Sequence, residues 1–593
     1  MGVRRLSFLG PALLLGTPAA AQLTAVPHSG EQSIVVTGER LRDVKPPDMS
    51  DWKVAETPHV LLFSKADPDD LARIAGNLEK LHFLLSILLN RVDTPDETLK
   101  LSVTMIGDPA DFDQLGLHNV RWQQGPYPSE FPDEIYYDPR EDGAVLASPD
   151  ADQCFKLDRG AAITTGEELT GFSPFGGNVE NSLLNAASGN HPGSKNCGNN
   201  PNKVSVTAEG RLYSTFAQHF LLTYFPAAYP RWYIEGFGEL FSTMDTATPG
   251  VIEYGQRPDK YRRVIEKFGH YPLKRVLDGT YLNDKRWFPA FSPYTAWGLA
   301  HLLFFSDEWK APLHNYLAAV ATGKSPEEAA AALGDLSKLA KQVAVYEYGK
   351  VPFERMTYPA GRFSPPLVRR LKKSEAAYVR GRLELGARVE LAKGDGAKGR
   401  ALGQREAWLK RLRSNAGQYP RELVAQQLLA EAECRSGNAA NCVASADRAL
   451  LIAAKDPVAL TWKGYGLALE ASGTSASGGD ARLSQARAMI IEANHLDTQS
   501  VLPLLAYYRS YAVSGEKVPD DAIDGLAKSL DAVPSAPSTR LLLGEALARR
   551  SDRGDARRIL LPLARGAFDP PEKPEAEQLL NDILSKPLAF NGH

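Results

Sequence analysis

The sequence lacks several features that mark common classes of protein. Beyond the first residues it has no uninterrupted run of about 18 apolar residues, the length that a membrane-spanning helix needs. We therefore expect no transmembrane segment in the mature chain. The net charge is only −3 and no basic patch dominates, so we also expect no nucleic-acid partner. A hydrophobic content of 43% and a charged content of 23% are typical of a soluble globular protein, and 593 residues suffice for three or four domains.

The beginning of the chain is typical of a bacterial export signal. Residues 1–21 have a positive end at Arg4 and Arg5, a short apolar run over 6–15, and small residues at 19–21 that suit cleavage near Ala21. This pattern predicts a signal peptide and a periplasmic or secreted protein.

Cysteine is scarce, with four residues in the whole chain. Their spacings do not fit a metal site, whereas an oxidising compartment would favour disulfides. Of the three possible connectivities, the simplest pairs Cys154 with Cys197 and Cys434 with Cys442.

Residues 22–50 are polar and punctuated by proline and glycine, which predicts a flexible arm. Within this arm, residues 33–40 (SIVVTGER) resemble the segment that opens the plug of TonB-dependent outer-membrane receptors. The resemblance implies contact with an envelope or outer-membrane protein by strand addition. The alternative is a plain extended stretch.

The centre of the chain predicts two helices joined by a turn, over residues 213–244. Pro226 and Pro230 bound the turn, because proline cannot continue a helix interior. The second helix places Glu235 and Glu239 four residues apart, and therefore on one face.

This helix pair resembles the active-site helices of gluzincin metallopeptidases, specifically the peptidase MA-like domains of secreted bacterial proteins. In that family an HExxH motif on the first helix supplies two zinc-binding histidines and a glutamate base, and a WxxEGxxE segment on the second supplies the third ligand. The second motif is intact here over 232–239 (WYIEGFGE). The five HExxH positions are instead occupied by Ser214, Thr215, Phe216, Ala217 and Gln218, and no HExxH occurs elsewhere.

These replacements decide the chemistry that the resemblance implies. Catalytic zinc needs three protein ligands and an open position, and serine and glutamine are weak neutral ligands. We therefore predict no catalysis and no cofactor, with Ser214 and Gln218 donating hydrogen bonds to Glu235. The predicted degenerate site comprises Ser214, Thr215, Gln218, Glu235 and Glu239. The alternatives are a reduced zinc site of His219, Glu235 and Glu239, or an unrelated activity in the same cleft.

Residues 51–350 form the predicted peptidase MA-like domain. We expect strands over 59–64, 99–106 and 143–147, and a helix over 67–89 with Asp67 as its N-cap. The Gly/Asn/Ser-rich insertion 150–207 contains Cys154 and Cys197 and is either a lid or a surface insertion. Residues 255–350 read as helical, with helices over 291–305, 310–322 and 325–333, and His301 is predicted to lie in the core.

A proline-punctuated linker is predicted over 351–374, and residues 375–593 read as helical hairpins that resemble tetratricopeptide repeats (TPR). Units are expected over 423–456, from 458 with a Gly/Ser insertion at 472–479, and over 500–532 and 537–567. Such a solenoid offers a concave surface for a peptide or protein partner, unless it is a plain helical spacer.

The fold class that follows is α+β. A zincin-like domain, with a small sheet, the active-site helix pair and a helical subdomain, precedes an all-α TPR-like solenoid. The expected function is that of a non-catalytic cell-envelope binding or scaffold protein. The alternative is an active extracytoplasmic zinc metallopeptidase with a non-standard ligand set.

Overall fold

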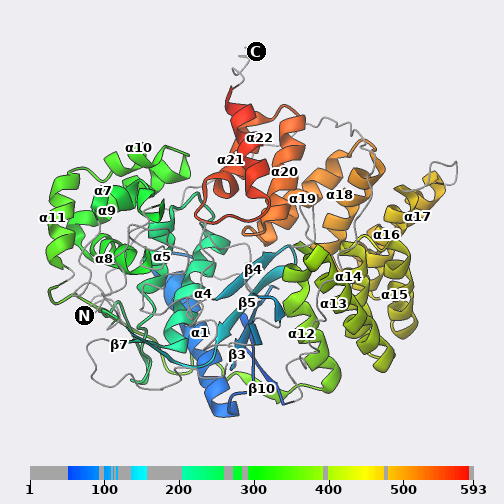
Figure 1. The fold of residues 1–593 in the computed structure, drawn as a ribbon, viewed down its shortest axis with the longest axis horizontal. Coiled ribbons are helices and arrows are strands. Elements are labelled where there is room, and N and C mark those ends of the chain that lie inside the picture. Colours follow the sequence, from blue (N-terminus) through cyan, green and yellow to red (C-terminus); the bar gives the residue numbers. More distant parts are fainter. Residues whose placement is uncertain are drawn as a thin grey trace.

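A computed structural model describes residues 51–92, 99–107, 111–112, 115–117, 135–156, 203–258, 272–283, 292–346, 348–390, 399–472 and 479–585 (Figure 1). The predicted signal peptide, the arm with residues 33–40, and Cys197 lie outside these residues. None of the helices in the described ranges combines the length and the apolar character needed to cross a bilayer.

A six-stranded mixed sheet forms the centre of the N-terminal part. Its strand order is β10-β1-β2-β3-β5-β4, in which β2, β3 and β5 run parallel and the remaining neighbours pair antiparallel. The strands are β1 (Lys53–Glu56), β2 (Val60–Ser64), β3 (Leu101–Ile106), β4 (Tyr136–Arg140), β5 (Gly143–Pro149) and β10 (Leu367–Arg370). The strands predicted over 59–64, 99–106 and 143–147 are confirmed, whereas β1, β4 and β10 were not predicted.

Helices cover both faces of this sheet, because successive residues of a strand point to opposite sides. On one face, α1 (Pro68–Leu88) and α4 (Ala208–Tyr224) pack into the main core with Leu62, Val103 and Leu146. On the other face, α12 (Lys373–Glu390) packs against Val54 and Val145. Helix α1 begins as predicted, with the Asp67 side chain accepting a hydrogen bond from the Asp69 amide.

Two short antiparallel ribbons complete the β structure of the residues that the structure describes. The predicted insertion 150–207 begins and ends in a pair of strands, β6 (Gln153–Lys156) and β7 (Lys203–Val206). The second ribbon joins β8 (Val251–Tyr254) to β9 (Glu354–Thr357).

The prediction of a linker over 351–374 is wrong. This segment contributes β9 to the second ribbon and β10 to the edge of the main sheet, where β10 pairs with β1. The prolines that suggested a linker include Pro359, Pro365 and Pro366, which lie between the two strands and interrupt neither of them. The segment therefore belongs to the N-terminal part.

A helical subdomain follows the central helix pair, as predicted. The second helix of that pair is α5 (Arg231–Glu239), and the subdomain after it comprises α7 (Leu273–Leu277), the 3-10 helix η1 (Thr280–Asn283), α8 (Ser292–Phe305), α9 (Asp307–Ala321), α10 (Pro326–Ala331) and α11 (Leu336–Tyr346). Core placement of His301 is confirmed: its ring nitrogens lie 2.6 Å from the Gly255 carbonyl oxygen and 2.8 Å from the Tyr346 hydroxyl.

Antiparallel helix pairs form the C-terminal part, which is consistent with TPR-like repeats. After α12 come α13 (Gly399–Gln418), α14 (Leu423–Arg435), α15 (Ala439–Ile452), α16 (Pro457–Ser472), α17 (Gly479–Leu496), α18 (Leu502–Ser514), α19 (Asp520–Ala532), α20 (Pro537–Arg549), α21 (Arg553–Arg565) and α22 (Lys573–Ser585). All four predicted units are confirmed as helix pairs. The predicted disulfide Cys434–Cys442 joins α14 to α15 across their turn.

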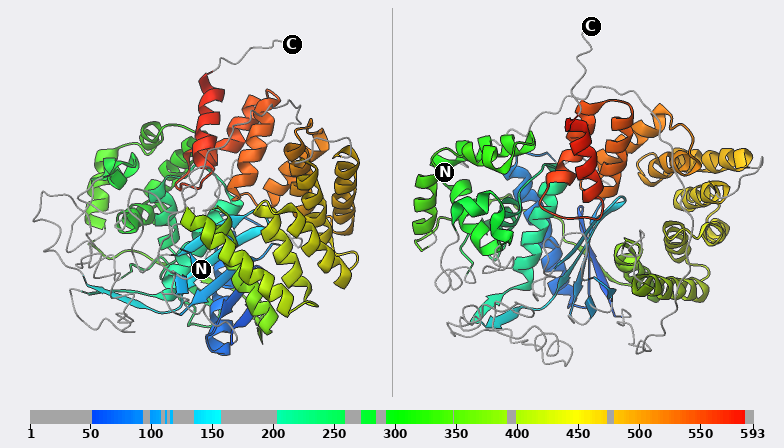
Figure 2. Two further views of the ribbon diagram at one scale, coloured as in Figure 1. Left: turned by 45° about the vertical axis from the view of Figure 1, so that its right-hand side comes forward. Right: turned by 45° about the horizontal axis from the view of Figure 1, so that its top comes forward.

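The repeats do not extend away from the sheet but curve around it, as Figure 2 shows. The last helices return to the N-terminal part, and Leu561 and Leu563 of α21 belong to the same core as α4 and α5. Leu561 packs so closely on Gly323 that a Cβ there would lie 2.8 Å from Leu561 Cδ1, and Arg557 donates to the Thr322 carbonyl oxygen at 3.1 Å. The arc of repeats is thus held to the N-terminal part at its far end.

Candidate functional site

The two helices that carry the predicted site lie in close contact. A Cβ on Gly238 of α5 would be 2.6 Å from the Ser214 carbonyl oxygen and 2.8 Å from Gln218 Nε2, so only glycine fits there without displacing α4. Gln218 Nε2 lies 3.5 Å from Ser214 Oγ. Helices α4 and α5 therefore lie in contact at Ser214, Gln218 and Gly238, whereas donation from Ser214 and Gln218 to Glu235 stays a prediction.

The remaining residues of the predicted site differ in their surroundings. At the other HExxH positions, Phe216 and Ala217 are buried in the main core and Thr215 is half-buried. Glu235 and Glu239 are both buried on α5.

Glu235, the residue that matches a zinc ligand in the resembled family, forms an ion pair on its own helix. Arg231 Nε donates to Glu235 Oε1 at 2.6 Å, and both side chains are largely buried. Burial opposes the charge of Arg231, but the Glu235 carboxylate outweighs it and raises the pKa of Arg231. Arg231 supplies the positive charge that a buried carboxylate needs.

His219 faces away from these carboxylates. Its Nδ1 lies 2.7 Å from the Tyr137 hydroxyl on β4 and 3.3 Å from Thr223 Oγ1. A helix turns by about 100° per residue, so a side chain one position after Gln218 points in another direction. The described residues contain no group of three or more His, Cys, Asp or Glu side chains placed to hold a metal ion, so His219, Glu235 and Glu239 are not brought together as one.

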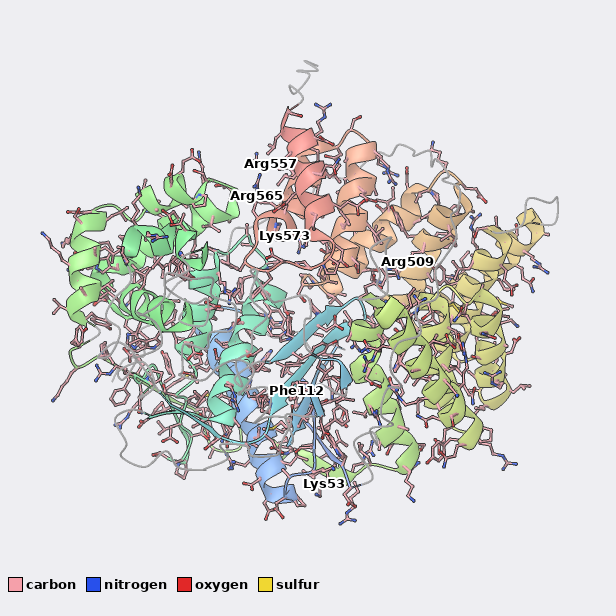
Figure 3. The ribbon with its side chains drawn as sticks, in the orientation of Figure 1. Lys53, Phe112, Arg509, Arg557, Arg565 and Lys573 are labelled. Carbon is pink, nitrogen blue, oxygen red and sulfur yellow. A yellow bond between two sulfur atoms is a disulfide. The ribbon has the colours of Figure 1, made fainter. Side chains whose placement is uncertain are left out.

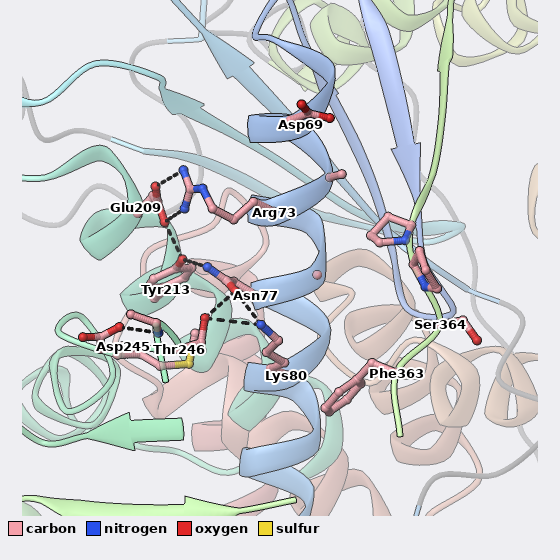
Figure 4. Close-up of a pocket in the computed structure, with 16 residues that line it drawn as sticks. Asp69, Arg73, Asn77, Lys80, Glu209, Tyr213, Asp245, Thr246, Phe363 and Ser364 are labelled. Carbon is pink, nitrogen blue, oxygen red and sulfur yellow. Dashed lines mark hydrogen bonds and ion pairs between the residues drawn. The ribbon is translucent and has the colours of Figure 1, made fainter. Parts of the chain in front are cut away.

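A pocket of about 630 Å³, lined by charged and polar side chains as well as apolar ones, lies between α1, the start of α4 and the segment that follows α5 (Figure 4). Glu209 accepts two hydrogen bonds from Arg73, at 2.7 and 2.9 Å, and one from Tyr213 at 2.6 Å. Asn77 donates to the Tyr213 hydroxyl at 3.0 Å and accepts from Thr246 at 2.8 Å. Because these groups satisfy one another, the network ties α1 to α4 rather than offering open positions to a ligand.

The concave surface of the repeats holds a segment of the chain itself. The β4–β5 hairpin has a two-residue turn, Glu141 and Asp142, and this turn enters the arc. Arg435 of α14, Arg509 of α18 and Ser538 of α20 converge on the Glu141 carboxylate; Figure 3 labels Arg509. We call these four residues the Glu141 clasp.

The Glu141 clasp is a buried, charge-assisted site. Glu141 is 3% exposed, and its oxygens lie 2.9 Å from Arg509 Nη1, 3.4 Å from Arg435 Nη1 and 2.6 Å from Ser538 Oγ. Burial alone would raise the pKa of Glu141, but the two guanidinium groups and the hydrogen bonds from Arg509 and Ser538 hold it far below its usual range. A fully ionised carboxylate therefore occupies the concave surface.

The residues on either side of Glu141 are fixed in the same way. Arg382 of α12 donates to Asp142 at 2.6 Å. Burial alone would raise the pKa of Asp142, but Arg382, with smaller contributions from Arg435 and Arg140, lowers it. Arg140 pairs with Asp138 at 2.6 Å and donates to the carbonyl oxygens of Arg382 and Leu383. Helices α12, α14, α18 and α20 are each the first of a pair, so one acidic turn is bound by four separate parts of the arc.

The sequence did not reveal this site. Arg435 and Arg509 lie on helices whose polar faces are typical of solvated surfaces, and Glu141 is 368 residues from Arg509 in the chain. The only local signal was an acidic pair before a glycine at a turn, which is common on protein surfaces.

No protein-family model matches this chain, and no curated protein matches it. Among solved structures, the chain is similar to the crystal structure of a thermophilic TPR protein from Thermus thermophilus, with 18% sequence identity and a TM-score of 0.27. The match covers 34% of this chain and 98% of that one. The repeat assignment therefore rests on the helix pairs themselves.

Proposed function

We propose that this chain is a non-catalytic binding or scaffold protein of the bacterial cell envelope. Its repeats provide the binding surface, and its N-terminal part is a peptidase MA-like domain that has lost the zinc motif. The observation that carries the proposal is the Glu141 clasp. In the clasp, side chains of the concave surface bind an acidic turn of the same chain, and a partner could present the same chemistry. A partner segment with the same chemistry would bind by displacing the hairpin.

The ion pair of Arg231 with Glu235 supports the non-catalytic part of the proposal. A guanidinium 2.6 Å from the carboxylate occupies the space and supplies the charge that a metal ion would otherwise bring. The residues present do not fit a zinc site, and we derive no chemistry through zinc. The Cys434–Cys442 disulfide supports export, because disulfides persist in oxidising compartments. Residues 33–40 are proposed as a second contact, to an outer-membrane protein.

Metal content and hydrolysis separate this proposal from an active zinc metallopeptidase. We expect the purified full-length chain, dialysed against micromolar zinc, to retain far less than one zinc per chain by mass spectrometry and to leave fluorescent casein uncut. Stoichiometric zinc that is lost in Glu235→Ala, together with chelator-sensitive hydrolysis, would overturn the proposal. Glu327→Ala, which alters an exposed carboxylate, is the matched control.

Peptide binding tests the role of the concave surface. A labelled peptide with the sequence of residues 136–149 (YYDPREDGAVLASP) is added to the wild-type chain and to Glu141→Gln, in which the hairpin is held less tightly. We expect fluorescence anisotropy to show at least tenfold tighter binding to the variant, or about 1.4 kcal/mol.

A second peptide shows whether the acidic side chain is recognised. The same sequence with Gln at the position of Glu141 should bind at least tenfold more weakly, because Arg435 and Arg509 favour an ionised partner. Equal binding of the two peptides, or equal binding of the first peptide to both proteins, would contradict the proposed use of this surface.

A further inference from the structure

A cavity of about 460 Å³ lies where the repeats meet the N-terminal part. One wall comes from α1, α4 and the adjoining strands, and includes His59, His82 and His219. The opposite wall comes from the residues before α18, the last part of α19 and the residues after it, including Val501, Lys528 and Pro534. Cavities of this size at interfaces between domains are common positions for small ligands.

The deep part of this cavity is aromatic and rich in imidazole. His59 and His82 stack with their ring centroids 3.6 Å apart, and His59 Nδ1 is bound to Glu79 at 2.7 Å. Phe216, Phe220 and Tyr224 also line the cavity. Burial, with smaller contributions from His59, Arg91 and His219, lowers the pKa of His82 to about 2, so this ring is neutral. These flat surfaces favour a planar apolar ligand body.

His219 offers one ring nitrogen to the cavity. Its pKa is lowered to about 4 by burial, so the ring is neutral at pH 7. Tyr137 stays protonated because burial raises its pKa, and its hydroxyl lies 2.7 Å from His219 Nδ1. With that hydroxyl as the donor, the imidazole carries its proton on Nε2, which has no partner among the described residues. In this tautomer His219 presents a hydrogen-bond donor to the cavity.

The charged residues that line the cavity are mostly cationic. They are Arg91, Lys100 and Lys528, against one carboxylate, Asp531. Arg91 lies over the Tyr224 ring at 3.5 Å, and Lys100 is paired with Glu56 at 2.6 Å. Lys528 is exposed and donates only to the Thr498 carbonyl oxygen, at 3.2 Å, so its charge is not paired with a carboxylate within the described residues. This balance favours an anionic ligand over a neutral or cationic one.

We propose that this cavity binds a small organic acid with a planar apolar body. The body stacks among the aromatic and imidazole rings, and the carboxylate accepts a hydrogen bond from His219 Nε2 and faces Lys528. Such a ligand touches both the N-terminal part and the repeats, so its binding stabilises the closed arc. The cavity lining contains none of Glu141, Glu235 and Glu239, so the ligand would not use the carboxylates of the Glu141 clasp or of the predicted degenerate site.

Three isosteric probes test the proposal on the full-length chain: benzoate, benzamide and benzamidine. We expect calorimetry at pH 7 to show benzoate binding at least tenfold more tightly than benzamide, and no saturable binding of benzamidine. Of the three probes, only benzoate should raise the midpoint temperature of thermal unfolding. Equal binding of benzoate and benzamide, or preferred binding of benzamidine, would overturn the proposal.

Variants locate the binding. His219→Phe should lower the affinity for benzoate at least tenfold. His219→Gln keeps an N–H donor near the Nε2 position and should retain most of the affinity. Lys528→Glu should lower the affinity for benzoate several-fold. Lys517→Glu makes the same charge change at an exposed position outside the cavity lining, and should leave binding unchanged. Benzoate binding that is indifferent to both His219→Phe and Lys528→Glu would place the ligand elsewhere and refute the assignment.

Discussion

Replacement of Glu141 by glutamine is expected to lower the free energy of unfolding by about 3–5 kcal/mol, the range found when one member of a buried ion pair is removed. The loss arises because Arg435 and Arg509 remain in the concave surface without their shared carboxylate. The shift of the urea midpoint at pH 7 measures it. Small-angle scattering should show a larger radius of gyration, because the hairpin no longer ties the repeats together.

The same residue predicts a dependence of stability on pH. An unfolded glutamate has a pKa near 4.5, and in the folded chain the pKa of Glu141 is strongly depressed. A depressed pKa gives a contribution that is fully present above the unfolded pKa and is lost as pH falls through the folded one. The wild-type chain should therefore lose stability more steeply than Glu141→Gln as pH falls below 4.5.

A matched control separates this effect from a general change of charge. Glu327→Gln makes the same substitution at an exposed position of α10 and should change the free energy of unfolding by no more than about 0.5 kcal/mol, as surface substitutions usually do. If Glu141→Gln and Glu327→Gln had the same urea midpoint and the same scattering profile, the Glu141 clasp would not hold the arc.

How far the sequence predicts this fold depends on the range of the interactions that decide each element. Helix α1 carries its own signals, with an N-cap at Asp67 and buried residues at helical spacing, and the repeat pairs are equally local. Strand β4 has no such pattern: all five residues are buried, and they include Pro139, Asp138 and Arg140. Pro139 is tolerated because β4 is an edge strand. The two buried charges are tolerated because Asp138 and Arg140 form an ion pair with each other.

The candidate site shows the same division. The contact of α4 with α5 was expected from the resemblance of their sequences to the gluzincin helix pair. The i, i+4 spacing of Arg231 and Glu235 is a local signal for the ion pair that they form. The partner of His219 was not available, because Tyr137 lies in a strand that the sequence did not reveal. The Glu141 clasp depends on contacts made only after the arc has closed.

Closure of the arc at its far end leads to the second large prediction, for Leu561. This side chain is buried against Gly323 in the core that α21 shares with the N-terminal part. Leu561→Asp loses the apolar contact and places a carboxylate in an apolar interface, so we expect a loss of at least about 3 kcal/mol. Limited proteolysis should cut the last helices earlier than in the wild-type chain.

Leu451→Asp makes the same change where leucine is 87% exposed, and should leave both the unfolding midpoint and the proteolysis pattern unchanged. Equal behaviour of the two variants would mean that α21 is not docked on the N-terminal part. Leu561 and Glu141 do not touch, but both hold the arc against the same sheet and subdomain. The double variant Glu141→Gln/Leu561→Asp should therefore lose less free energy of unfolding than the sum of the two single losses. Once the first substitution has opened the arc, the second contact contributes less to stability.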